Sequence, residues 1–166
     1  MMRVVTDVYR TLNSFGYFKG INKCQWTSAM NHYRSRYEKN IAKGLELGGV
    51  SFEYETVKIK YHLKKRGKCN DCFGTSVSLL RTYTPDFIFK KGEIIVEAKG
   101  RFTSSDRTKM KQVVKEHPDL DIRMLFMRNQ FCTKSKTNTY SDWCKKYGIK
   151  YAFGVSIPNA WLKEIG

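Results

Sequence analysis

Residues 83–100, which read YTPDFIFKKGEIIVEAKG, decide the fold. Two runs rich in β-branched and aromatic residues flank one glycine, a pattern typical of a β-hairpin. A two-residue turn at residues 91–92 sets a register in which Asp86 falls directly opposite Glu97. Opposed residues of an antiparallel pair have Cβ atoms about 4.5–5.5 Å apart. The two carboxylates therefore repel each other unless a cation lies between them.

Lys99 supplies a cation on the same face, because it lies two residues beyond Glu97 on a strand. Ile94, Val96 and Ala98 alternate with these residues and point toward a core. Two carboxylates and an ammonium on one face can place a divalent metal beside a phosphate. The alternative is a surface hairpin with an exposed Lys–Glu pair, which contributes about 0–1 kcal/mol.

Composition indicates a single domain with a polyanionic partner. The chain has 166 residues, with 31 Lys and Arg against 15 Asp and Glu, a net charge of +16. Nucleic acid is favoured, since each neutralised phosphate releases counterions. A membrane surface is the alternative, but no run approaches the roughly 18 apolar residues that a spanning helix needs.

The first residues contain no uninterrupted apolar segment, so no secretory signal peptide is expected. The five cysteines are odd in number and irregularly spaced, which favours a reducing compartment over a disulfide framework. Cys69 and Cys72 form one C-x-x-C pair, two of the four ligands of a structural zinc. Without a second such pair, we favour two ordinary thiols over zinc.

The remaining pattern predicts an α/β fold with a mixed sheet flanked by helices. The expected elements are a helix over 33–47, a strand over 50–61, a basic loop over 64–68, the hairpin, a helix capped by Ser104 or Ser105 and ended by His117-Pro118, a buried strand over 120–127, a helix over 141–147 and a strand over 149–153. Because a helix connects them, strand 120–127 should run parallel to the second hairpin strand. Residues 1–30 form an extension without an assigned role, ahead of a domain over 31–166.

Glu38 is a third candidate acid, since it lies in line with Ile41, Ala42 and Leu45 on the first helix. A carboxylate facing a core is costly unless it is paired or coordinates a metal. We expect a third metal-facing carboxylate; the alternative is a side chain that reaches solvent at the edge of the stripe.

Together, Glu38, Asp86, Glu97 and Lys99 predict metal-dependent hydrolysis of a phosphodiester. One or two Mg²⁺ ions would activate water and neutralise phosphate oxygens. Lys99 would stabilise the developing negative charge or position the attacking water.

Basic side chains at three places are expected to contact phosphates rather than only solvent. They are Arg34 on the first helix, then Lys64, Lys65, Arg66 and Lys68 in the basic loop, and finally Arg101, Arg107, Lys109 and Lys111 after the hairpin.

Several motifs together resemble the phage endonuclease I family of the PD-(D/E)XK nuclease superfamily, whose core has a similar order of elements. They are Arg34-Ser35-x-x-Glu38, Phe52-Glu53-Tyr54-Glu55, Tyr83-Thr84-Pro85-Asp86-Phe87, Val96-Glu97-x-Lys99-Gly100, Ser105-Asp106-Arg107, His117-Pro118-x-Leu120-Asp121-Ile122-Arg123, Tyr147-Gly148-Ile149-Lys150 and Ile157-Pro158-x-x-Trp161. The resemblance covers about residues 33–165. The segment 62–80, expected as a basic cysteine-containing loop, is longer than the family pattern.

This resemblance implies that Glu38, Asp86, Glu97 and Lys99 are the catalytic positions. It implies a homodimer that cuts four-way (Holliday) DNA junctions with Mg²⁺ or Mn²⁺, in the cytoplasm of a bacterial host. The dimer would be intertwined by exchange of the first helix and strand, so that Glu38 completes the partner's site. Alternatives are a nuclease for duplex or mismatched DNA and a non-catalytic basic DNA-binding module, for which acids facing phosphate have no use.

Overall fold

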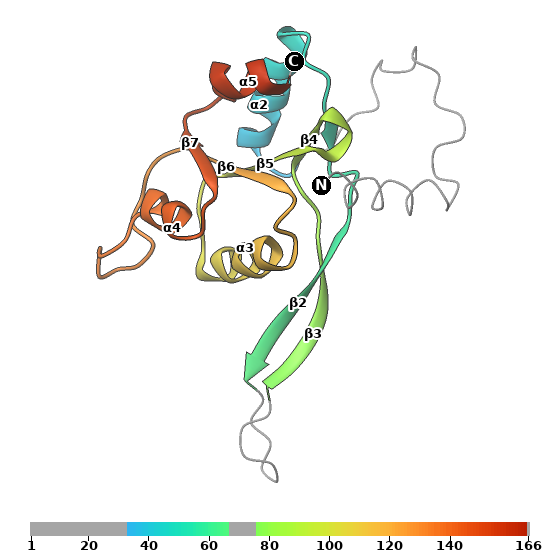
Figure 1. The fold of residues 1–166 in the computed structure, drawn as a ribbon. Helices are drawn as coiled ribbons and strands as arrows, with labels where there is room; N and C mark the ends of the chain where they lie inside the picture. Colours follow the sequence, from blue (N-terminus) through green and yellow to red (C-terminus); the bar gives the residue numbers. More distant parts are fainter. Residues whose placement is uncertain (1–32, 67–75, 166) are drawn as a thin grey trace, which may run out of the picture.

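A mixed α/β architecture is seen in the computed structural model, which describes residues 33–66 and 76–165 (Figure 1). The elements are α2 (Arg36–Leu47), β1 (Glu53–Tyr54), β2 (Ile59–Arg66), β3 (Ser76–Tyr83), β4 (Phe87–Phe89), the 3-10 turn η1 (Lys90–Gly92), β5 (Ile94–Lys99), α3 (Ser104–Glu116), β6 (Asp121–Phe126), α4 (Tyr140–Lys146), β7 (Lys150–Phe153) and α5 (Asn159–Ile165). Five strands form one sheet in the order β1-β4-β5-β6-β7, while β2 and β3 form a separate pair. The predicted fold class, a mixed sheet flanked by helices, is confirmed.

The five-stranded sheet lies between two layers of helices. Helices α2 and α5 cover one face, and α3 and α4 cover the other (Figure 1). Strand β5 pairs antiparallel with β4 and parallel with β6, as expected for a strand–helix–strand crossover. None of the described helices is long and apolar enough to cross a membrane.

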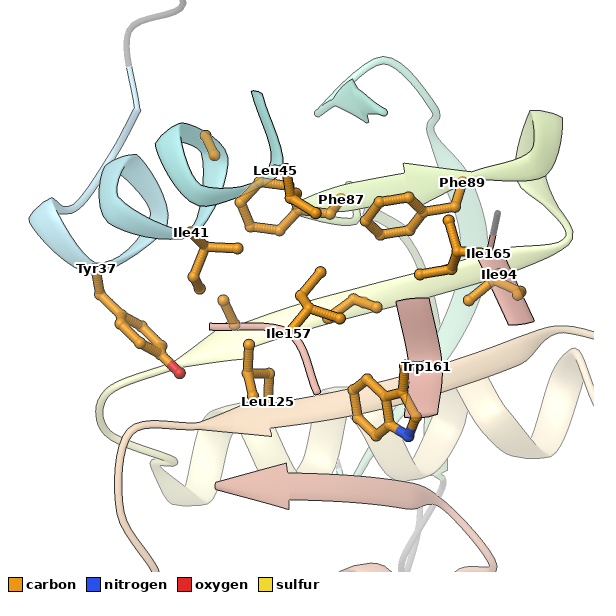
Figure 2. Close-up of a cluster of buried hydrophobic side chains, with 13 residues drawn as sticks. Tyr37, Ile41, Leu45, Phe87, Phe89, Ile94, Leu125, Ile157, Trp161 and Ile165 are labelled. Atoms are coloured by element: carbon orange, nitrogen blue, oxygen red, sulfur yellow. The ribbon is translucent and has the colours of Figure 1, made fainter. Parts of the chain in front are cut away.

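The predicted stripe of α2 packs on the sheet (Figure 2). Ile41 and Leu45 are buried against Phe87 of β4, and Trp161 of α5 closes the same cluster. Burying a side chain of this size contributes about 1.5–3 kcal/mol. The stripe thus fixes the helix, and with it Glu38, near the hairpin.

The other face of the sheet holds a second cluster, in which α3 covers the centre of the sheet. Met110 and Val113 of α3 are completely buried against Met124 and Phe126 of β6. This packing holds α3 against the face of the sheet opposite α2.

The predicted hairpin register is correct. Phe87 pairs with Val96 and Phe89 with Ile94, so one further step outward sets Asp86 opposite Glu97. The predicted two-residue turn at 91–92 is wrong in detail, since residues 90–92 form a 3-10 turn, η1.

The strand predicted over 50–61 is wrong as one element, since β1 ends at Tyr54 and β2 begins at Ile59. Glu55 has φ 52°, in the left-handed region, which turns the chain out of the sheet. The Glu55 N–H donates to the Asp86 carbonyl at 3.1 Å, and this hydrogen bond holds the turn beside the candidate site.

The basic loop predicted over 64–68 is also wrong in its first part. Lys64, Lys65 and Arg66 end β2, which pairs with β3 over its whole length. These strands form a hairpin that projects from the body of the molecule (Figure 1). Residues 1–32 and 67–75, and with them Lys68, Cys69 and Cys72, lie outside the described residues. The side chains of Lys65 and Arg66 are not described either.

Helix α3 begins one or two residues earlier than expected, because Thr103 rather than Ser104 or Ser105 is its cap. The Thr103 hydroxyl accepts from the Asp106 N–H at 3.2 Å, and the Asp106 carboxylate accepts from the Thr103 N–H at 3.0 Å. This reciprocal capping box needs an acid three residues after the cap, which only Thr103 has. The predicted end at His117 is confirmed.

Candidate active site

Asp86, Glu97 and Lys99 form a buried cluster at the end of the hairpin. The residue Glu97 is 1% exposed and Asp86 5%. The Lys99 Nζ lies 2.8 Å from Glu97 Oε1 and 3.7 Å from Asp86 Oδ2. The cation that the register required between two opposed acids is therefore present.

The protonation of this cluster follows from its burial. Burial and the neighbouring Glu97 carboxylate raise the pKa of Asp86 from 3.8 to about 7, although Lys99 and the Ala98 N–H lower it. That N–H donates to Asp86 Oδ2 at 2.8 Å. Burial lowers the pKa of Lys99, but Glu97 and Asp86 raise it more, so Lys99 keeps its proton.

Glu97 has two further partners that sequence reasoning did not assign to it. The Tyr83 hydroxyl donates to Glu97 Oε2 at 2.7 Å, and Lys109 Nζ lies 3.5 Å from Oε1. Lys109 was expected only in a basic surface patch. The available signal was its position next to Met110, which faces the sheet. No spacing rule pointed to Tyr83, because it precedes Pro85 and lies outside the β4–β5 register.

Glu38 is buried at 8% exposure, so its predicted inward orientation is confirmed. Its carboxylate accepts from the Ser35 hydroxyl and the Tyr54 hydroxyl, each at 2.5 Å. The Glu38 charge contributes to the raised pKa of Asp86. Over residues 33–66 and 76–165, however, no three His, Cys, Asp or Glu side chains are grouped to hold one ion. Within one chain, the structure brings Asp86 and Glu97 together without Glu38 as a third ligand.

The Asp86–Glu97 pair fits a hard divalent cation. Mg²⁺ and Mn²⁺ prefer carboxylate oxygens, and Mg²⁺ is usually bound by only one or two carboxylates together with water and substrate phosphates. Both carboxylates are oriented, since a backbone amide holds Asp86 Oδ2 and the Tyr83 hydroxyl holds Glu97 Oε2. These two acids would hold the metal.

Some of the predicted phosphate-binding residues make contacts within the protein, and others are exposed to solvent. Arg34 Nε lies 2.8 Å from Glu55 Oε1, so this ion pair connects the start of α2 with the turn after β1. Arg107 donates to a backbone carbonyl at 2.6 Å and supports the α3 terminus. Arg101, directly after the β5 end, and Lys64, on the projecting hairpin, are both exposed to solvent.

The sequence has clear relatives. Residues 20–166 match the family described as Phage endonuclease I. The chain is 36% identical over 147 residues to "Endonuclease I" of Escherichia phage T7, covering 88% of this chain and 85% of that protein. It is 35% identical over 133 residues to "Endodeoxyribonuclease 1" of Enterobacteria phage T3, covering 80% and 78%. By the extent of these matches, the chain belongs to the phage endonuclease I family.

Proposed function

We propose that this protein is a metal-dependent endonuclease that resolves four-way DNA junctions as a homodimer. The observation that carries this proposal is the pair of buried carboxylates, Asp86 and Glu97, with Lys99 between them. Membership of the family supports nuclease chemistry, and the names of the T7 and T3 relatives support DNA as the substrate. The net charge of +16 matches a polyanion.

In the proposed mechanism, Asp86 and Glu97 bind the metal, which would supply an activated water and neutralise charge at the phosphate. Lys99 contacts Glu97 Oε1 at 2.8 Å, so metal binding would release its ammonium toward the phosphate. In the metal-free site, burial lowers the pKa of Lys99 but Glu97 and Asp86 raise it more, so Lys99 enters the reaction as a cation.

We assign Glu38 to the site of the partner subunit. Two hydroxyl groups orient its carboxylate, yet Glu38 does not group with Asp86 and Glu97 around one ion in the described part of the chain. A buried carboxylate that two hydroxyl groups orient within the described residues suits a site completed by a second copy. The exchange of α2 and β1 between subunits would bring Glu38 there.

Exposed basic residues would hold the arms of the junction. Arg101 lies beside the site, and Lys64 lies on the β2–β3 hairpin; Arg34 would exchange its contact with Glu55 for a phosphate. We expect the enzyme to act inside the bacterial host, where phage DNA recombines.

Cleavage of a synthetic four-way junction with Mg²⁺ tests this function. Asp86→Ala and Glu97→Ala should lose cleavage yet still bind the junction, whereas Asp119→Ala, at an exposed acid, should cut normally. Cleavage that survives in either active-site variant would refute the site. Faster cleavage of linear or mismatched duplex would instead indicate another endonuclease substrate, and binding without cleavage by the wild type would indicate a binding module.

Mixing subunits tests the shared site. Glu38→Ala and Glu97→Ala proteins are each expected to be inactive, and refolding them together should restore cleavage in heterodimers that keep one intact site. No recovery, with heterodimers shown to form, would place Glu38 and Glu97 in the same chain's site.

A further inference from the structure

We propose that Lys109 is a second catalytic lysine that contacts the scissile phosphate, and that Tyr83 is the residue that positions both Lys109 and Glu97. This proposal rests on the nuclease function above and adds to it a second cation and its support. The observations are the contacts that Tyr83 and Lys109 make with Glu97.

Lys109 approaches Glu97 from a different element than Lys99 does. Lys109 comes from the second turn of α3, and its Nζ lies 3.5 Å from Glu97 Oε1, the oxygen that Lys99 also contacts. The Lys109 side chain is 26% exposed, against 20% for Lys99, so solvent and substrate can reach both ammonium groups. Two lysines thus converge on one carboxylate oxygen from two directions.

Tyr83 holds this arrangement in place. It is 1% exposed, its hydroxyl donates to Glu97 Oε2 at 2.7 Å, and the Lys109 Nζ lies 5.2 Å from its ring centroid. An ammonium over an aromatic ring gains about 0.5–2 kcal/mol. Because the tyrosine occupies Oε2, Glu97 would offer Oε1 to a metal, and both lysines would then lose their contact with this oxygen.

Charge balance supports a second lysine. Asp86, Glu97 and the Glu38 assigned to the same site carry three negative charges when ionised, while a divalent cation, Lys99 and Lys109 carry four positive charges. The phosphodiester and an attacking hydroxide add two negative charges, so one negative charge remains with both lysines and two remain with Lys99 alone. Lys109 thus halves the uncompensated charge of the transition state.

Lys115 provides a control on the same helix. It lies in the last turn of α3 and is exposed to solvent, whereas Lys109 lies in the second turn and contacts Glu97. The two lysines therefore share helix and charge and differ in this contact.

The test combines junction cleavage under single-turnover conditions with Mn²⁺ binding to the full-length protein without DNA, measured by electron paramagnetic resonance. Lys109→Met should cut about 100-fold more slowly with junction Kd within about 3-fold, and Lys109→Arg should recover most of the rate. Lys109→Met should also bind Mn²⁺ about 5-fold more tightly, since a cation competing for Glu97 is lost. Tyr83→Phe should bind Mn²⁺ about 5-fold more weakly.

These opposite effects on metal binding and cleavage separate a catalytic lysine from a structural one. Lys115→Met should change neither the cleavage rate nor Mn²⁺ binding. Equal cleavage by Lys109→Met and wild type, or equal losses in Lys109→Met and Lys115→Met through weaker junction binding, would overturn the proposal while leaving the nuclease function intact. Wild-type protein that cuts no DNA would remove the proposed function and this proposal with it.

Discussion

Replacing Asp86 by asparagine is expected to stabilise the metal-free protein at pH 8, although it should abolish cleavage. Asp86 is 5% exposed and lies opposite Glu97, so its ionised form is poorly solvated and close to a like charge. An amide keeps the shape of the side chain and can still accept the Ala98 N–H that Asp86 Oδ2 accepts at 2.8 Å.

The magnitude follows from the raised pKa of Asp86. Burial and Glu97 raise it from 3.8 to about 7. At about 1.4 kcal/mol per pH unit, ionisation of Asp86 destabilises the folded state by roughly 4 kcal/mol above pH 7. The amide introduces N–H donors without a designed partner, which costs about 1–2 kcal/mol. We therefore expect Asp86→Asn to raise the free energy of unfolding by about 2–3 kcal/mol at pH 8.

The sign and the pH range are set by linkage. Between about pH 4 and pH 7, folded Asp86 holds a proton that the unfolded chain has released, so the contribution of Asp86 to stability falls as pH rises. The asparagine variant lacks this slope. The difference between the two proteins should be smallest near pH 4, grow up to pH 7 and level off above it.

Urea unfolding at pH 5, 6, 7 and 8, with a chelator to remove divalent ions, measures this difference. Asp119→Asn, at an exposed aspartate between α3 and β6, is the control and should change stability by no more than about 0.5 kcal/mol. A less stable Asp86→Asn protein at pH 8, or a difference that does not vary with pH, would refute the reasoning that burial beside Glu97 disfavours the Asp86 charge.

Three further changes test the scaffold by urea unfolding. Arg123 is 1% exposed and pairs with Asp121, so Arg123→Ala should lower the free energy of unfolding by about 3–5 kcal/mol. Lys150→Ala, in the same network, should lower it by at most about 1 kcal/mol, and equal losses in the two variants would contradict this reasoning. Met110→Ala should lower the free energy of unfolding by about 2–5 kcal/mol, because this α3 side chain is completely buried. A loss below about 1 kcal/mol would show that neighbouring side chains fill the cavity. Thr103→Ala removes the α3 capping box and should cost about 1 kcal/mol, with no effect if the terminus is capped otherwise.

Local pattern was sufficient for much of the fold. The apolar stripe of α2, the hairpin register and the parallel strand after α3 each depend on spacing within a short segment. The break at Glu55 could not be read in this way. Residues 50–61 have strand-like composition throughout, and the positive φ of Glu55 depends on its hydrogen bond to Asp86, 31 positions away.

The β2–β3 hairpin was missed for a related reason. Strand β3 is followed directly by the predicted β4–β5 hairpin, and strand β2 ends in a lysine-rich run that is typical of a solvated loop. Pairing with β3 makes this run a strand, since an edge that carries lysines is compatible with a sheet.

The sequence by itself determined that Asp86, Glu97 and Lys99 share one face, because the two-residue periodicity of strands and the position of the turn set this register. Helical periodicity aligned Glu38 with the apolar stripe, and the structure decided between the inward orientation and the edge of the stripe by burying this side chain. Only the tertiary structure decided what surrounds these acids. Tyr83 and Lys109 reach Glu97 because the packing of α3 on the sheet and the path of β3 place them there, and such contacts between separate elements leave no periodic signal in the chain.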